Sequence, residues 1–229
     1  MLGILDSGSG GENTARELRR HRPDADIALY LDREHAPYGE RSEEELIRLV
    51  EDGILSLRAS GAEPILLACC TASSVYEKLS PEARAISLPI IESVAKAALE
   101  MAEGERIALL ATERTVASGE FGRYLGKDLI ASIPSGKLVR LIDGGACDGR
   151  ADEALQDYLV DLLAPLKDSE VGVLILGCTH FSSLAGEIST ALGKIIKNKI
   201  LIADSAKIAA ETLISSGVVL SGVGREMRL

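Results

Sequence analysis

Short runs of apolar residues alternate along the chain with longer stretches in which apolar residues recur at helical spacing. Continuous apolar character over a few residues is typical of parallel strands that are buried on both faces. Runs of this kind occupy residues 2–5, 27–31, 65–68, 107–111, 138–142, 171–176 and 200–202. Helical spacing is found in residues 42–60, 152–166 and 205–216, and Ser42 with Glu45 has the spacing of a capping box. The alternation predicts an α/β fold with mainly parallel sheets flanked by helices.

Two of the predicted strands run into segments that resemble one another. Residues 65–74 read Ile-Leu-Leu-Ala-Cys-Cys-Thr-Ala-Ser-Ser, and residues 174–183 read Leu-Ile-Leu-Gly-Cys-Thr-His-Phe-Ser-Ser. The repeat predicts two related halves, which we expect to span residues 1–91 and 92–205, with residues 206–229 returning to the first half. Because ligands of such folds bind outside the carboxyl ends of the strands, both segments lie where a site is expected. The last residues, 221–229, are expected to form a loose tail.

The composition narrows the class of protein. Of the 229 residues, 46% are hydrophobic, which suffices for a sizeable core, and the formal net charge of -10 disfavours a nucleic-acid partner. The first residues lack the basic and apolar segments of a signal peptide, and no apolar run approaches the ~18 residues of a membrane span. Four cysteines without a Cys-x-x-Cys pair disfavour a disulfide scaffold and a zinc ribbon. We therefore expect a reduced, cytoplasmic protein with a small-molecule substrate and no membrane partner.

Cys69 and Cys178 are the principal candidates for chemistry. A lone cysteine after an apolar strand is usually a small core residue, but two cysteines in repeated contexts suggest a shared role. Removing the weakly acidic proton α to a carboxylate needs a base on one face of the carbon, and inverting the centre needs an acid on the other. A thiolate and a thiol supply both, which is the plan of a two-base racemase. Because Cys70 directly precedes a threonine, as Cys178 does, the repeat leaves open whether Cys69 or Cys70 corresponds to Cys178.

Asp6 ends the first predicted strand and is followed by the sequence Ser-Gly-Ser-Gly-Gly. Backbone N–H groups at the start of the next helix would suit an anion such as a carboxylate. The segment is neither a P-loop nor a dinucleotide fingerprint, because no Gly-Lys-Ser/Thr follows and Asn13 takes the third glycine position. A flexible turn is the plainer interpretation, but an acidic side chain at a strand end must be paired or functional.

Further polar residues follow other predicted strands. His180 lies two residues after Cys178, where a histidine can lower the pKa of a thiol. Asp143 would orient His180 or a substrate amine, with an ordinary turn residue as the alternative. Thr112 and Thr115 are expected to cap a helix, with a ligand contact as the alternative.

The remaining candidates have plainer explanations. Tyr38 and Gly39 lie in a Pro-Tyr-Gly turn, and they are equally consistent with a turn alone and with ligand contacts. Cys147 is expected to be structural. His21 and His35 have no evident partners and are expected at the surface or in turns.

Taken in order, these motifs resemble those of the cofactor-independent aspartate/glutamate racemases, and most closely those of the glutamate racemases within that family. The matching blocks are residues 6–11, 36–42, 68–73, 111–118, 177–180 and 203–205. The resemblance implies two pseudo-symmetric α/β domains with the active site in the cleft between them, often in a homodimer. It also implies interconversion of L- and D-glutamate without a cofactor or a metal, which supplies D-glutamate for peptidoglycan.

Carried over position by position, the resemblance assigns Cys69 and Cys178 as the catalytic pair, supported by Asp6 and His180. Substrate-binding or supporting positions of the family match Asp6, Ser7, Tyr38, Gly39, Thr71, Thr179 and His180. This correspondence selects Cys69 over Cys70 as the catalytic thiol of the first half.

The chain also departs from the family. Cys70 stands where the family has an asparagine, Asp143 stands where it has a glutamate, and Phe181-Ser182 differs from the family's aromatic and proline. Because a thiol is a weaker hydrogen-bond donor than an amide, Cys70 is a substrate-binding position on which substrate identity depends. The departures leave two alternatives, a related enzyme acting on another acidic carboxylate and a catalytically silent amino-acid-binding protein.

Overall fold

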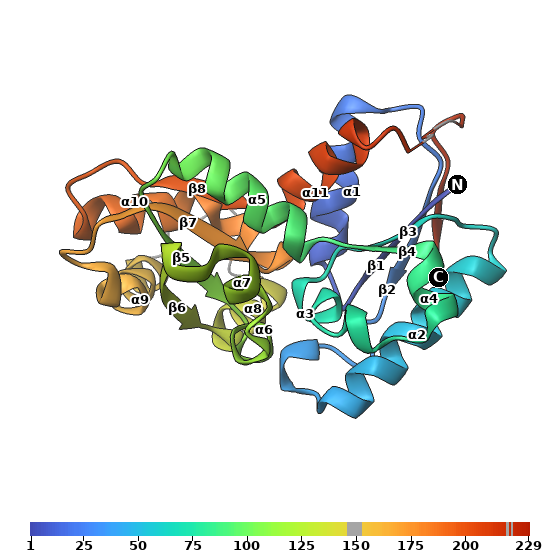
Figure 1. The fold of residues 1–229 in the computed structure, drawn as a ribbon, viewed down its shortest axis with the longest axis horizontal. Coiled ribbons are helices and arrows are strands. Elements are labelled where there is room, and N and C mark those ends of the chain that lie inside the picture. The colour runs from blue at the N-terminus through green and yellow to red at the C-terminus, as the bar shows by residue number, and fades with distance from the viewer. Residues whose placement is uncertain (146–152, 219, 221) are drawn as a thin grey trace.

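The computed structural model describes residues 1–145, 153–218, 220 and 222–229, and its strands form two separate sheets. The five-stranded sheet has the order β4-β3-β1-β2-β9, and the four-stranded sheet has the order β6-β5-β7-β8. Neighbouring strands are parallel in both sheets, and helices flank them (Figure 1). The prediction of an α/β fold is confirmed.

The first sheet is built from the N-terminal part of the chain and one strand at its end. Its strands are β1 (Leu2–Asp6), β2 (Ile27–Leu31), β3 (Ile65–Leu67), β4 (Ser87–Pro89) and β9 (Glu226–Arg228). Its helices are α1 (Gly10–His21), α2 (Glu43–Ala59), α3 (Cys70–Ser73) and α4 (Pro81–Ile86), with the short turns η1 (Tyr38–Glu40) and η2 (Tyr76–Lys78). Helix α2 begins as the capping box predicts, because Ser42 Oγ accepts a hydrogen bond from Glu45 N at 3.2 Å.

The second sheet is built from residues between 106 and 204. Its strands are β5 (Arg106–Ala111), β6 (Leu129–Pro134), β7 (Val171–Gly177) and β8 (Leu201–Asp204). Its helices are α6 (Glu113–Ser118), α7 (Glu120–Leu125), α8 (Gly136–Asp143), α9 (Glu153–Leu163) and α10 (Ala185–Ile195), with η3 (Gly126–Asp128), η4 (Ala164–Leu166) and η5 (Thr179–Leu184). In the part of the chain that the structure describes, every helix is too short or too polar to cross a membrane.

Helices α1, α5 (Ile91–Ala102) and α11 (Ser205–Ser215) join the two sheets (Figure 1). Helix α11 packs on α1 and α5, and α5 also packs on β5, β7 and β8. One core cluster therefore includes Leu18, Ile27 and Val94 together with Ile107 and Leu213. Burying a side chain of this size contributes about 1.5–3 kcal/mol, so the shared core holds the two halves against each other. The division of the chain at residue 91 stays a prediction.

One expectation about the second half was wrong, and one of its strands was not expected. Residues 138–142 belong to helix α8 and not to a strand. Leu138, Val139 and Ile142 are buried while Arg140 is exposed, which is helical spacing, but a run of five residues is too short to reveal it. The strand of this region is β6, which was missed because it lies at the sheet edge and every second residue is exposed, while only Ile133 is buried.

The expectation of a loose C-terminal tail was also wrong for the described residues of that tail. Strand β9 pairs with β2, and the carboxylate of Asp26 accepts hydrogen bonds from Val223 N at 3.0 Å and from Arg225 N at 2.8 Å. The guanidinium of Arg225 adds two bonds to the same carboxylate, at 2.7 and 3.1 Å. These contacts hold the pKa of Asp26 well below its usual range. The C-terminal residues are thus held by β2 and by Asp26 just before it, which lie about 200 residues earlier in the sequence.

Arg225→Ala is expected to lower the free energy of unfolding at neutral pH, because it removes the cation that stabilises the Asp26 carboxylate. A depressed native pKa contributes stability above the unfolded value of about 3.9 and loses it as the pH falls below that value. The difference in free energy of unfolding between Arg225→Ala and the original protein, measured by urea unfolding, should therefore be smaller at pH 3 than at pH 7. Arg48→Ala, at an exposed arginine, is the control. A difference independent of pH would contradict the assignment.

Candidate active site

Polar residues follow the carboxyl ends of the central strands, where the two halves meet. Strand β1 ends at Asp6, and Cys69 follows β3 as the residue before α3. In the second half, Thr112 follows β5 and caps α6, while Cys178 follows β7 as the residue before η5. All four side chains are buried.

Cys69 and Cys178 occupy equivalent places in the two halves. Each lies between a buried strand and the first turn of a short helix, and each is about 5–6% exposed. Cys70 is instead the first residue of α3 and belongs to the core cluster shared by the two sheets. Burial raises the pKa of Cys70. In the structure, therefore, Cys69 is the counterpart of Cys178.

Burial is the main influence on the acidity of both thiols. It raises the pKa of Cys69 to about 11, and the nearby charge of Asp6 adds to the rise. It also raises the pKa of Cys178 well above the ordinary value, followed by the effect of a charge at Cys69. Ser7 Oγ lies 3.6 Å from Cys69 Sγ and favours its thiolate. Because each thiolate opposes ionisation of the other, two thiolates at the same time are strongly disfavoured.

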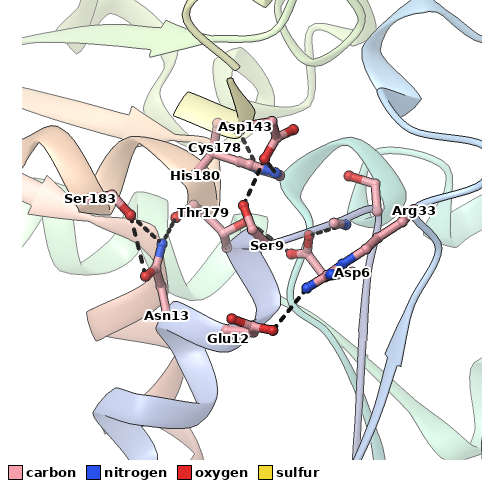
Figure 2. A network of polar contacts seen from close by, with 12 residues as sticks. Asp6, Ser9, Glu12, Asn13, Arg33, Asp143, Cys178, Thr179, His180 and Ser183 are labelled. Atoms are coloured by element: carbon pink, nitrogen blue, oxygen red, sulfur yellow. Dashed lines mark hydrogen bonds and ion pairs between the residues drawn. The ribbon is translucent and has the colours of Figure 1, made fainter. Parts of the chain in front are cut away.

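The carboxylate of Asp6 links the first half to the second. It is fully buried, and it accepts hydrogen bonds from Gly8 N at 3.1 Å and from Thr179 Oγ1 at 2.8 Å (Figure 2). Burial raises the pKa of Asp6, against the opposing effects of His180 and of these hydrogen bonds. Thr179 directly follows Cys178, so the bond ties the second thiol segment to the end of β1.

His180 lies between Cys178 and Asp143. Its Nδ1 is 3.7 Å from Cys178 Sγ, and its Nε2 is 3.5 Å from Asp143 Oδ1. The imidazole is buried, and Nε2 has no hydrogen-bond partner among the described residues. Asp143 is the last residue of α8, so a helix rather than the expected strand carries it to His180.

Three threonine hydroxyls meet beside the first thiol segment. Thr71 Oγ1 lies 2.9 Å from Thr112 Oγ1 and 3.1 Å from Thr115 Oγ1, and the latter two are 3.0 Å apart. Thr112 also accepts a hydrogen bond from Thr115 N at 3.3 Å, which is the expected helix cap. Thr71 belongs to the first half and the other two to the second, so this cluster is a further bridge between the halves.

Tyr38 and Gly39 form the turn η1, which packs against the second half. Tyr38 is buried and its hydroxyl donates to Asp32 Oδ2 at 2.8 Å. A Cβ atom on Gly39 would come within 2.9 Å of the Thr112 Cβ, so a side chain there would push the halves apart. Asp32 Oδ1 also lies 2.8 Å from His35 Nδ1, a partner that the sequence did not reveal, and His35 lies in a bend as expected.

Three polar residues of the site, Asp32, Asn13 and Ser9, were not expected from the sequence. Asp32 follows the end of β2 as Asp6 ends β1, and that position was an available signal. Asn13 Nδ2 donates to the backbone oxygen of Thr179 at 2.8 Å and to Ser183 Oγ at 3.1 Å. Ser9 Oγ donates across the halves to Asp143 (Figure 2). These last contacts depend on how the halves pack, which no local pattern encodes.

Cys147 lies outside the described residues. Within the described ranges, no group of three or more His, Cys, Asp or Glu side chains is placed to share a metal ion. The polar groups gathered at the strand ends are thiols, hydroxyls, carboxylates and one imidazole. Such groups can exchange protons with a small molecule and hold its charged ends by hydrogen bonds.

The chain matches the family described as Asp/Glu/Hydantoin racemase over residues 12–213, and it belongs to that family. It is similar to the glutamate racemase of Desulforudis audaxviator, with 33% identity over 198 residues, which cover 84% of this chain and 71% of the relative. The family resemblance inferred from the motifs is therefore confirmed.

Solved structures agree with the fold. A glutamate racemase isoform from Bacillus anthracis superposes with a TM-score of 0.83 at 26% identity, covering 100% of this chain and 86% of that one. The glutamate racemase from Thermus thermophilus in complex with β-chloro-D-alanine gives 0.77 at 28% identity, covering 99% and 86%. The two-sheet arrangement is thus that of the glutamate racemase fold.

Gly10→Ala is expected to lower the free energy of unfolding by about 2 kcal/mol, as overpacking of a tight contact does. A Cβ atom at Gly10 would overlap the Thr179 hydroxyl and crowd His180 N, so α1 would have to move away from η5. Gly122→Ala in α7 is the matched control, because its Cβ would meet no atom within 4 Å. Thermal and urea unfolding measure the difference, and equal stability of the two variants would contradict the close packing.

Proposed function

We propose that the protein is a cofactor-independent racemase that interconverts L- and D-glutamate, with Cys69 and Cys178 as its two acid–base groups. The observation that carries the proposal is the equivalent placement of two buried thiols, each between a strand and a short helix, one in each half. The Asp6–Thr179 hydrogen bond joins the segments that bear them. Two proton-handling groups from opposite halves are what inversion at one carbon requires.

In the proposed reaction, the thiolate of one cysteine takes the α-proton and becomes a thiol. The electron pair left on the α-carbon is delocalised into the substrate carboxylate. The thiol of the other cysteine then donates its proton to the opposite face and becomes a thiolate. Atoms and charge balance, and the reverse direction exchanges the two roles. Burial raises the pKa of both cysteines, and a negative charge on Cys69 further opposes ionisation of Cys178, so the site holds at most one thiolate at a time.

Hydroxyl and backbone N–H groups around the thiols suit the charged ends of an amino acid. Ser7 Oγ lies 3.6 Å from the first thiol, Thr71 lies two residues after that thiol, and Thr179 directly follows the second. The Gly39 turn packs beside Thr112. The buried Asp6 carboxylate suits a substrate ammonium group. Because these side chains are buried, we infer that the halves separate to admit the substrate and close again around it. The 33% identical relative, a glutamate racemase, supports glutamate as the substrate.

Incubation with L- or D-glutamate in heavy water is expected to give α-deuterated glutamate and loss of optical rotation. Cys69→Ser and Cys178→Ser should each slow racemisation by at least about a hundredfold, because each removes one acid–base group. Mass spectrometry and polarimetry follow the two signals, and circular dichroism verifies that the variants are folded.

A panel of other acidic amino acids, including aspartate, tests the consequence of Cys70. Faster α-proton exchange with another amino acid of the panel would support the racemase mechanism but identify that amino acid, and not glutamate, as the substrate. Full exchange by both serine variants would exclude the two-thiol mechanism. Tight binding of glutamate without deuteration would identify a binding protein.

A further inference from the structure

Ser9 is the N-cap residue of α1, but its hydroxyl bonds to the other half of the protein instead of capping the helix. It lies at the N-cap of α1, where a serine commonly accepts a hydrogen bond from its own helix, but its side chain makes no capping bond. Its Oγ instead donates to Asp143 Oδ1 at 2.8 Å, across the boundary between the two halves (Figure 2). The same Asp143 oxygen lies 3.5 Å from Nε2 of His180.

The glycines on either side of Ser9 show how closely this turn packs against the second half. A Cβ atom on Gly8 would come within 3.1 Å of His180 Nε2, and one on Gly10 would overlap the Thr179 hydroxyl. The turn that carries Ser9 therefore packs directly against Thr179 and His180, which follow Cys178. When the halves are closed, the Ser9 hydroxyl therefore lies next to Asp143 and close to the imidazole of His180.

The carboxylate of Asp143 is held less firmly than the carboxylate of Asp6. Its side chain is 40% exposed, whereas Asp6 is fully buried and held by two hydrogen bonds. Asp143 is also the last residue of α8, where the helix dipole disfavours a negative charge. Without the Ser9 hydroxyl, water would compete for the carboxylate, and it would turn away from His180.

We propose that Ser9 is a positioning residue, which holds Asp143 against His180 on closure and so aligns His180 with Cys178. The inference rests on the proposed racemase function. A residue of the first half, Ser9, would thus help to align Cys178, the acid–base group of the second half. Full alignment of Cys178 would then depend on closure, which delivers Ser9 to Asp143.

Ser9→Ala is expected to lower kcat for glutamate racemisation roughly three- to tenfold with little change in KM, because Ser9 contacts no substrate group in this account. Since two enantiomers have equal free energy in water, kcat/KM must fall by the same factor in both directions. Ser9→Thr retains a hydroxyl and should restore most of the rate. Ser183→Ala, at a serine that also bonds across the boundary but does not touch Asp143, is the matched control.

A double-mutant cycle keeps the test independent of folding defects. In an Asp143→Ala background, removing the Ser9 hydroxyl should cost little further activity, because its acceptor is already absent. Equal rates for Ser9→Ala and the original protein, or independent losses from the two substitutions, would overturn the role of Ser9 alone. An original protein without α-proton exchange would overturn the proposed function itself and the role of Ser9 with it.

Discussion

The hydrogen bond from Thr179 to the buried carboxylate of Asp6 is the contact on which the arrangement of the site depends. A carboxylate without solvent is costly unless its oxygens are bonded, and the second half supplies one of the two donors that meet this need. Separating the halves would remove that donor. Because Thr179 follows Cys178 directly, the contact that satisfies Asp6 also brings the second thiol to the first half. In the proposed racemase, closure of the two halves would therefore also assemble the site.

Burial has two consequences for the groups enclosed by that contact. It raises the pKa values of Asp6, Cys69 and Cys178 together, so each charge in the site opposes the next. A closed site therefore holds few charges at once, which suits a reaction that moves one negative charge from one sulfur to the other. Donors such as the Ser7 hydroxyl lower the cost of that charge without adding another.

The parts of the site that local patterns encode could be predicted, and those that packing encodes could not. Asp6, Cys69 and Cys178 stand directly at the ends of apolar strands, where the topology of parallel sheets gathers them. Asp143 was recognised, but its element was wrong, because five apolar-rich residues fit a short strand and an amphipathic helix equally well. Ser9 reaches Asp143 only through the packing of the halves, as the C-terminal strand reaches β2.

A crystal structure with D-glutamate bound would test most directly whether the two thiols flank a single carbon. We expect Cys69 Sγ and Cys178 Sγ on opposite faces of the α-carbon, each about 3–3.5 Å from the reacting atoms, as a near-attack geometry requires. The substrate would then lie between the segments that the Asp6–Thr179 bond joins. A ligand bound elsewhere, or both sulfurs on one face of the α-carbon, would contradict a two-thiol inversion.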